Sequence, residues 1–285
     1  MPKIAITAAT GHLGQLVVQA LLNRGVPAGD IVAIVRDPAK AADLAAKGVE
    51  VRQADYRQPG GWPAALAGVE RLLLISSNDF NDRVGQHRTV IEAAKAAGVK
   101  LLAYTSLLKA DTAQMSLAAD HWGTEQALRE SGVPHTVLRN GWYLENYNVR
   151  QALETGAVLG AAGEGRIHAA ARQDYAEAAA AVLTGQGHAG KVYELAGDQG
   201  FTMAELTAEI ARQGGKTVVY QNLPAAEYGK MLEGFGLPVP VAQMLASSDT
   251  GIARGELASS STDLRDLIGH PTTTLAEGVA AQLSS

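Results

Sequence analysis

The stretch Lys3-Ile-Ala-Ile-Thr-Ala-Ala-Thr-Gly-His-Leu-Gly14 decides the fold of this 285-residue chain. Its first five residues form an apolar run that predicts a strand, and the residues after it have the periodicity of a helix. Between them, Ala8, Gly11 and Gly14 keep a G-x-x-G-x-x-G spacing, with alanine in the first glycine's place. A glycine turn between a strand and a helix N-terminus predicts a phosphate cradle, because N–H groups and the helix dipole face the anion. The alternative is an ordinary strand–helix turn.

The composition fits a globular protein and argues against several classes of partner and of site. Apolar residues make up 47% of the chain, which is enough for a sizeable core, and the net charge is −5. The negative charge argues against nucleic acid or an anionic membrane as the main partner. The absence of cysteine excludes disulfides and thiolate metal sites, and it suits a cytoplasmic protein. We expect no signal peptide and no membrane span, because the chain enters a strand almost at once and holds no long apolar run.

The end of the second predicted strand indicates the cofactor. Residues 31–35 are apolar throughout, as in a strand covered on both faces. An NAD site usually has an acid there, about twenty residues after the glycine loop, to bind the ribose 2′-hydroxyl. Here the residue is Arg36, whose guanidinium suits a 2′-phosphate, and Lys40 adds a second charge one turn later. The alternative is a solvated strand end. Asp37 is expected to cap a helix that begins with Pro38.

Strands and helices alternate through the first half of the chain. This alternation predicts an α/β fold with a doubly wound parallel sheet of the Rossmann type. The further predicted strands are 49–53, 71–75, 100–104 and 135–138, and the helices are 89–97 and 116–131. We expect a dinucleotide-binding domain over residues 1–149, with a returning segment near 170–197. Residues 150–285 would form a smaller, mainly helical lobe that covers the substrate.

Within that second half, three acidic capping patterns mark helix starts. They are Asp174 with Glu177, Thr202 with Glu205, and Thr274 with Glu277. Residues 156–165 are rich in glycine and alanine and predict a loop. Strands are expected at 191–195 and 217–220. This half holds no second phosphate loop and no metal-ligand spacing, so no metal is predicted.

Ligands of doubly wound folds lie at the carboxyl ends of the strands, where several candidate residues occur. Asp55 is expected either to bind the adenine amino group or to cap a turn. Ile75, Ser76 and Ser77 would let the nicotinamide ribose approach closely. The loop 78–85, with Phe80 in it, and the longer loop 107–115 would line the mouth of a site.

The assembled pattern resembles the atypical short-chain dehydrogenase/reductase superfamily, in its NmrA-like branch, over essentially the whole chain. The segments that carry the resemblance are residues 7–14, 33–40, 53–56, 73–77, 103–106, 138–143 and 268–275. They are most similar to the quinone-reducing bacterial members, with triphenylmethane reductases as near relatives. The resemblance implies a Rossmann domain, an NADP(H) site and a flavin-free transfer of hydride to a quinone-like acceptor.

The chain departs from the superfamily pattern in its catalytic residues. Other members carry Tyr-x-x-x-Lys on the helix after the fifth strand, whereas His121 and Glu125 have that spacing here. Ser106 or Thr105 stands near the place of the usual serine. A protonated His121 would stabilise or protonate the oxyanion of a reduced quinone; the alternative is a histidine on the helix surface or behind the site. We favour a small role, because a hydroquinone anion is stable and solvent can supply the proton.

The resulting predictions name three groups of residues. The catalytic candidates are His121, Asn140 and Ser106. The acceptor would contact Phe80, Trp142, Tyr143 and Tyr147, although the last three would serve equally as core. The cofactor contacts are Thr7, Ala9, Thr10, Gly11, His12, Leu13, Gly14, Arg36, Lys40, Asp55, Ile75, Ser76, Ser77, Asn140, Gly141 and Trp142. Two rival functions stay open: an NADP(H)-binding sensor without turnover, and a reductase of other conjugated acceptors such as dyes. A homodimer is also left open.

Overall fold

The structure is a computed structural model that describes residues 2–79 and 81–284, and the chain divides into two compact units. Unit 1 comprises Met1–Ser106, Asp120–Arg139 and Arg172–Tyr193. Unit 2 comprises Leu107–Ala119, Asn140–Ala171 and Glu194–Ser285. The chain therefore passes between the units several times. The expected division had a boundary at residue 149 and a segment that returns near 170–197, and unit 1 includes Arg172–Tyr193.

A seven-stranded sheet forms the centre of unit 1, with the strand order β3-β2-β1-β4-β5-β6-β8. Its strands are β1 (Lys3–Ile6), β2 (Ile31–Val35), β3 (Glu50–Gln53), β4 (Val69–Leu74), β5 (Leu101–Leu107), β6 (His135–Asn140) and β8 (Val192–Leu195). The pairings of β1 with β2 and β4, of β2 with β3, and of β4 with β5 are parallel. The order reverses at β1, as in a dinucleotide-binding fold, and the predicted Rossmann sheet is confirmed.

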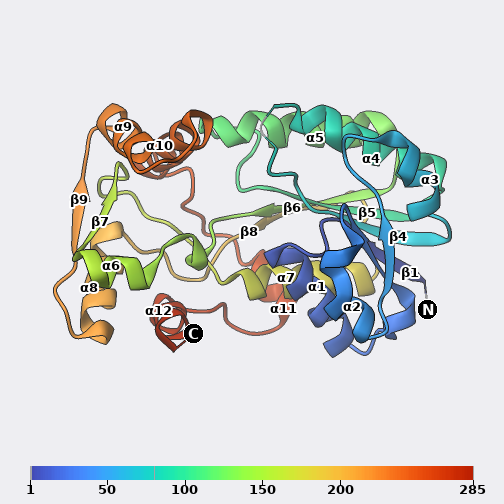
Figure 1. Ribbon diagram of the computed structural model, residues 1–285, viewed down its shortest axis with the longest axis horizontal. Coiled ribbons are helices and arrows are strands. Elements are labelled where there is room, and N and C mark those ends of the chain that lie inside the picture. The colour runs from blue at the N-terminus through green and yellow to red at the C-terminus, as the bar shows by residue number, and fades with distance from the viewer. Residues whose placement is uncertain (1, 80, 285) are drawn as a thin grey trace. The chain divides into compact units, whose positions relative to one another are not determined.

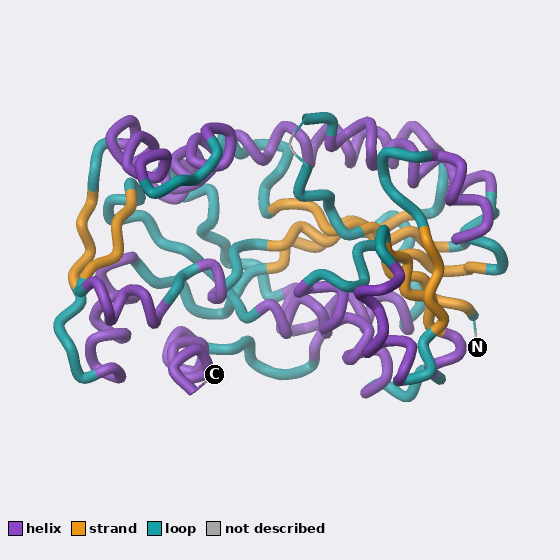
Figure 2. The backbone as a smooth tube through the Cα atoms, viewed as in Figure 1, coloured by secondary structure: helices purple, strands orange, loops and turns teal. Residues whose placement is uncertain are grey.

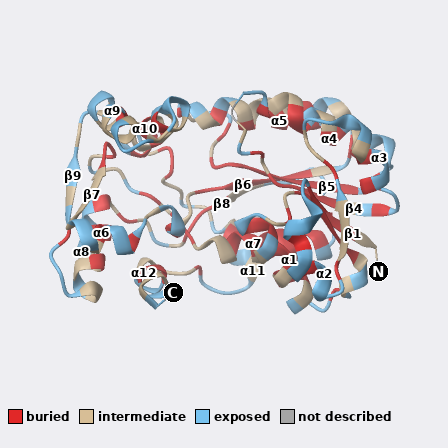
Figure 3. Cartoon of the chain, viewed as in Figure 1, coloured by how far each residue is buried: buried red, intermediate tan, exposed pale blue. Residues whose placement is uncertain are grey.

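Helices cover both faces of this sheet (Figure 1). They are α1 (His12–Asn23), α2 (Ala42–Ala46), α3 (Trp62–Ala65), α4 (Arg83–Ala96), α5 (Ser116–Ser131) and α7 (Arg172–Thr184). Figure 1 shows α3, α4 and α5 on one face and α1, α2 and α7 on the other. The five inner strands are buried along most of their length, whereas the edge strands β3 and β8 are partly exposed (Figure 3). Burial on both faces explains why β2 consists only of apolar residues.

Unit 2 is mainly helical around a small core. Its two strands, β7 (Ala157–Gly160) and β9 (Val219–Asn222), run parallel and side by side (Figure 2). Its helices are α6 (Val149–Thr155), α8 (Met203–Gly214), α9 (Ala225–Gly234), α10 (Val239–Ala253), α11 (Asp263–Ile268) and α12 (Leu275–Ser284). Leu206 and Ile210 of α8 and Ile252 of α10 are buried in one hydrophobic cluster. No helix in the described ranges is long and apolar enough to cross a membrane.

Most predicted helix caps are confirmed. Thr202 and Glu205 form a reciprocal capping box at the start of α8, and the Thr274 Oγ1 accepts a hydrogen bond from the Glu277 N–H at 3.3 Å. The Asp37 carboxylate accepts a bond from the Ala39 N–H at 3.1 Å, although the residues it caps form a short 3-10 turn before α2.

Three local predictions are wrong. Helix α4 begins at Arg83, six residues before the predicted start, because the Asp82 carboxylate caps it by accepting the Gly85 N–H. Helix α7 begins at Arg172, which places Asp174 inside its first turn and buries that residue rather than leaving it as the cap. The predicted loop 156–165 contains β7, because pairing with β9 supplies hydrogen bonds that the local sequence does not reveal.

Candidate active site

The turn after β1 has the backbone geometry that a phosphate cradle needs. Ala8 has a φ of +48°, a left-handed conformation that glycine adopts at less cost than alanine. Gly11 lies at the N-cap of α1, and its N–H donates to the Ala8 carbonyl at 2.9 Å. A Cβ on Gly14 would lie 2.5 Å from the Ala8 oxygen and 2.7 Å from the Ala9 Cα. Gly14 is therefore required for the close packing of α1 on the turn.

The N-terminus of α1 is suited to an anion. Among the described residues, no side chain caps it and no acid occupies its first turn. Gly11 and His12 are exposed, whereas Leu13 is buried. The first N–H groups of a helix have no partner within it and carry the positive end of its dipole. An external phosphate would satisfy these donors.

Arg36 directly follows β2 and is exposed, as is Lys40 four residues later. The Gln53 side chain donates to the Arg36 carbonyl at 3.0 Å, which holds the backbone at this point. The guanidinium also contributes to the lowered pKa of Asp55, although the main cause is the hydrogen bond from Arg57. Arg36 is thus an exposed, positively charged residue at the carboxyl end of β2, which is the position predicted from the sequence.

Asp55 adopts the turn-capping alternative. Its carboxylate accepts the Arg57 N–H at 2.9 Å and pairs with the Arg57 guanidinium at 3.1 Å. The Thr7 side chain is also occupied within the fold. Its hydroxyl accepts the Ile75 N–H at 2.9 Å and lies 2.6 Å from the Tyr56 hydroxyl. The N–H of Thr7 is also hydrogen-bonded within the sheet, so its side chain and its N–H are both occupied.

The segment after β4 is fixed by groups that sequence reasoning missed. The Ser76 N–H donates to Thr105 Oγ1 at 2.9 Å, and the Ser77 N–H donates to His87 Nε2 at the same distance. Burial, with the nearby Arg83 charge, lowers the pKa of His87 to about 3. The neutral ring must accept at Nε2, so its Nδ1–H donates to Thr124 Oγ1, 2.8 Å away. His87 is the fifth residue of α4, and only the correct helix start would have placed it here.

His121 lies inside the protein and not on the surface of its helix. The residue is only 8% exposed, and its Nδ1 is 2.9 Å from the Tyr104 hydroxyl. Burial, reinforced by the positive charge of Arg83 and by His87, lowers its pKa well below 6.5. The imidazole is therefore neutral at neutral pH, and the hypothesis of a protonated His121 is not supported by its surroundings.

Glu125, at the position of the superfamily's lysine, belongs to a separate buried cluster. It accepts a hydrogen bond from Ser106 Oγ at 2.7 Å and two from the Arg139 guanidinium, at 2.9 and 2.8 Å. Glu125 is completely buried. The Ser106 hydroxyl is thus committed to this carboxylate, which leaves it poorly placed to act as an acid.

In unit 2, Asn140 presents a polar atom that the chain does not satisfy. Its Nδ2 donates to the Tyr143 hydroxyl at 3.2 Å, but its buried Oδ1 finds no hydrogen-bond partner among the described residues. Unsatisfied buried oxygens are uncommon in proteins, and each one calls for an explanation. The next residue, Gly141, donates its N–H to the Leu195 carbonyl at 2.8 Å. Trp142, Tyr143 and Tyr147 are partly buried, and Phe80 lies outside the described residues.

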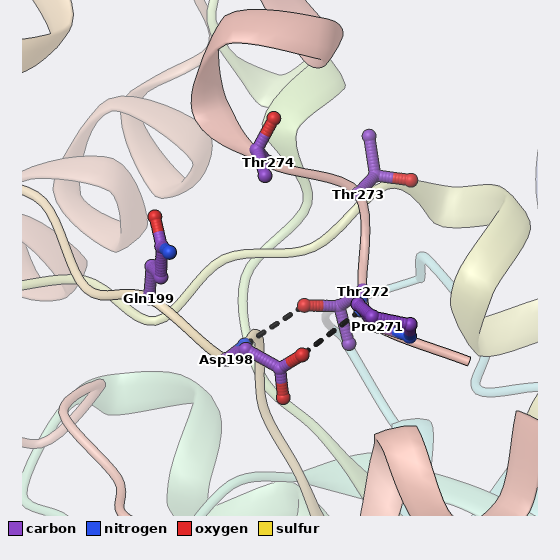
Figure 4. Close-up of a pocket in the computed structure, with 6 residues that line it drawn as sticks. All are labelled: Asp198, Gln199, Pro271, Thr272, Thr273 and Thr274. Atoms are coloured by element: carbon purple, nitrogen blue, oxygen red, sulfur yellow. Dashed lines mark hydrogen bonds between the residues drawn. The ribbon is translucent and has the colours of Figure 1, made fainter. Parts of the chain in front are cut away.

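A separate small cavity in unit 2 does not resemble a substrate site (Figure 4). It measures about 60 Å³ and lies among residues 198–199 and 271–274. Asp198 and Thr272 exchange two hydrogen bonds across it, of 2.8 and 3.0 Å. The cavity has room for water only, and the paired bonds tie the segment before α12 to the end of β8.

Residues 2–258 match the profile of the NmrA-like family. The chain belongs to the NmrA-like family. Quinone oxidoreductase 2 of Escherichia coli K12 is 56% identical to this NmrA-like protein over 279 residues, which cover 97% of each chain. The resemblance stated from the sequence is therefore confirmed.

Two solved structures extend this comparison. The NADPH-dependent quinone oxidoreductase of Escherichia coli, complexed with NADPH, matches with a TM-score of 0.95 at 55% identity. The match covers 98% of this chain and 99% of that chain. Triphenylmethane reductase of Citrobacter sp., complexed with NADP(H), matches with a TM-score of 0.93 at 42% identity, covering 98% and 99%.

His121 offers the first test of the site in this NmrA-like protein. We expect His121→Gln, which keeps a polar side chain beside Tyr104, to lower kcat by less than about tenfold, below the usual 10²–10⁴-fold loss of a general acid. The measurement is kcat with a benzoquinone at several pH values, together with NADPH affinity. A folded variant that binds NADPH normally and is inactive at every pH would restore His121 as the proton donor.

Proposed function

We propose that the protein is an NADPH-dependent, flavin-free oxidoreductase that transfers hydride to a quinone-like acceptor. The assignment of NADPH as the cofactor rests on the uncapped N-terminus of α1, which packs against its turn through Gly14. It also rests on Arg36, which follows the end of the next strand. The acceptor class rests on the 56% identity to Quinone oxidoreductase 2 over nearly the whole of both chains.

The residues present fit NADPH. The N–H groups of Thr10, His12 and Leu13 would bind the pyrophosphate, and Arg36 with Lys40 would bind the 2′-phosphate. The backbone of Ser76 and Ser77, held by Thr105 and His87, would support the nicotinamide ribose. The orphaned Oδ1 of Asn140 would accept an N–H of the carboxamide. When bound, NADPH supplies the hydride, and the protein's task is to hold two flat rings at reacting distance.

The other contacts predicted from the sequence, to the cofactor and to the acceptor, also belong to this proposal. Thr7, Ala9 and Gly141 would approach the cofactor through their backbone, and Ile75 through its buried side chain. The aromatic side chains of Trp142, Tyr143 and Tyr147 would contact the acceptor. Unit 2 would serve as the lobe that binds the acceptor, and unit 1 as the lobe that binds the cofactor.

The proposed function is tested by steady-state oxidation of NADPH by the purified, flavin-free protein, with and without 1,4-benzoquinone. We expect little oxidation without the quinone and a saturable, quinone-dependent rate with it. Tight NADPH binding without acceptor-dependent oxidation across a broad panel of quinones would reject the enzyme and favour the sensor. A triphenylmethane dye belongs in the panel, because the similarity to triphenylmethane reductase at 42% identity favours it as a second acceptor class.

Cofactor preference depends on Arg36. A charge-assisted hydrogen bond contributes about 1.5–3 kcal/mol, or one to two orders of magnitude in binding. We therefore expect Arg36→Ala to raise the KM for NADPH about 10–100-fold and to leave NADH nearly unchanged. Lys47→Ala, which removes an exposed cation bound to Gln19, is the matched control. Equal changes for NADPH and NADH would show that Arg36 does not read the 2′-phosphate.

We also propose that the protein acts in the cytoplasm, because NADPH, its proposed reductant, is a cytoplasmic metabolite. A homodimer stays a prediction, which sedimentation of the purified protein would test.

A further inference from the structure

A cluster of oxygen-bearing side chains in unit 2 contains Tyr147, which is proposed above to contact the acceptor, and three residues that have no role so far. It consists of Tyr147, Tyr220 on β9, Tyr228 on α9 and Asp249 on α10. Figure 1 shows β9 leading into α9, which packs beside α10, while β7 runs along β9. Electrostatic interactions with Asp249, Tyr228 and Tyr220 all contribute to the pKa of Tyr147. The four side chains therefore lie within interaction range of one another.

The loop after β7 holds two members of this cluster in place. The Asp249 carboxylate accepts the Ala161 N–H at 2.7 Å, and the Tyr220 hydroxyl accepts the Ala162 N–H at 2.8 Å. A Cβ on Gly160 would lie 2.6 Å from Asp249 Oδ2 and 3.1 Å from the Tyr220 hydroxyl. Glycine at position 160 is thus what lets both side chains approach this backbone.

Tyr147 is the member of the cluster that the chain leaves unsatisfied. Its hydroxyl is buried and forms no hydrogen bond with the described residues. Burial is the main cause that raises its pKa well above 10, and the Trp142 side chain opposes this effect. A buried hydroxyl without a partner costs about 1–3 kcal/mol. A buried phenol with this energetic cost indicates that its hydroxyl donates a hydrogen bond to an oxygen of a bound ligand.

Resting on the proposed function, we propose that Tyr147 and Asp249 form the polar end of the acceptor site, where Tyr147 hydrogen-bonds a carbonyl oxygen and Asp249 protonates it. Asp249 releases its proton to that oxygen, where an O–H bond forms as the hydride supplied by NADPH reduces the ring. The Asp249 carboxylate then takes up a proton from water. Because His121 is neutral, it is not the proton donor. If a side chain supplies this proton, that side chain must lie elsewhere in the protein.

The chemistry of Asp249 suits this role. Burial raises its pKa to about 6, and the Ala161 N–H only partly offsets that effect. The titratable groups that face it are the three phenols, with the exposed Glu164 acting on Tyr220. A carboxyl group with this pKa is partly protonated near neutral pH, as a general acid must be.

The sign of the effect on stability follows from the same shift. The folded-state pKa lies above that of an unfolded aspartate, so the ionised group destabilises the fold above pH 6. This penalty disappears as pH falls below about 4, where both states are protonated. Asp249→Asn keeps an acceptor for the Ala161 N–H and removes the charge. It should therefore raise Tm more at pH 8 than at pH 4.

The test compares the wild-type protein, Asp249→Asn and the control Glu164→Gln in quinone-dependent NADPH oxidation between pH 5 and 9. We expect wild-type kcat to fall above about pH 6. In Asp249→Asn, kcat should fall about 10²-fold at pH 6 and lose that pH dependence, while NADPH affinity is unchanged. Glu164→Gln should behave as the wild type.

A second variant, Tyr147→Phe, tests the binding half of the proposal. Loss of the unpartnered hydroxyl should leave Tm unchanged or higher, while the KM for the quinone rises about tenfold. A wild-type protein without quinone-dependent activity would reject the proposed function itself. An active wild type with an unaltered kcat and pH profile in Asp249→Asn would overturn the role of Asp249 alone.

Discussion

Gly14→Val is expected to abolish NADPH binding, with an affinity loss of at least about 10²-fold. The first side-chain atom would already lie 2.5 Å from the Ala8 oxygen and 2.7 Å from the Ala9 Cα. Because both contacts are with backbone, α1 must move away from the turn. Overpacking of this kind costs about 1–3 kcal/mol, and it would displace the N–H groups that face the phosphate.

The measurement is NADPH affinity by fluorescence titration, with circular dichroism to confirm that the variant is folded. Gly14→Ala provides a milder variant, because the same Cβ contacts apply to a single methyl group. Gly29→Ala is the matched control, since a Cβ there meets no atom within 4 Å. Normal NADPH affinity in a folded Gly14→Val protein would show that this turn does not bind the pyrophosphate.

Glu125→Leu is expected to produce the largest loss of stability. The substitution removes the carboxylate from the Arg139 guanidinium, whose side chain is only 6% exposed. Removal of one partner from a buried ion pair costs about 3–5 kcal/mol. We expect Tm to fall by about 10 °C, measured by thermal denaturation at neutral pH.

Glu130→Leu, on the same helix, is the control for this substitution. Glu130 pairs with Arg88 at the surface, where the two side chains are 63% and 47% exposed. Exposed ion pairs contribute at most about 1 kcal/mol, so the control should change Tm by only a few degrees. Similar Tm losses in the two variants would mean that the burial of Glu125 does not determine how much it contributes to thermal stability.

The Rossmann sheet was predictable because its signals are local. The apolar strand 31–35, the glycine spacing from Ala8 to Gly14 and the Asp37 cap each act within a few residues. Ala8, in the place of the first glycine, has a φ of +48°, and the substitution itself is visible in the sequence. Strand β7 escaped prediction because its partner, β9, is about sixty residues away in the chain.

The polar interior was less predictable than the cofactor turn. His121 and Glu125 have the spacing of the superfamily's Tyr-x-x-x-Lys pair, but His121 bonds Tyr104 and Glu125 bonds Arg139. Their separation depends on which strand each side chain faces, and four-residue spacing on a helix does not contain that information. His87 and Asp249 were missed for the same reason, since their partners Ser77 and Ala161 lie on other elements.

The central claim is that this chain passes hydride directly from NADPH to a quinone without a flavin. The most direct measurement is an anaerobic single turnover of flavin-free protein with 1,4-benzoquinone, using NADPH and NADPH deuterated at the transferred C4 position. The account predicts one hydroquinone for each NADPH oxidised and a slower transfer with the deuterated cofactor. Absence of hydroquinone from a protein that binds NADPH, or formation of hydroquinone only after flavin is added, would contradict it.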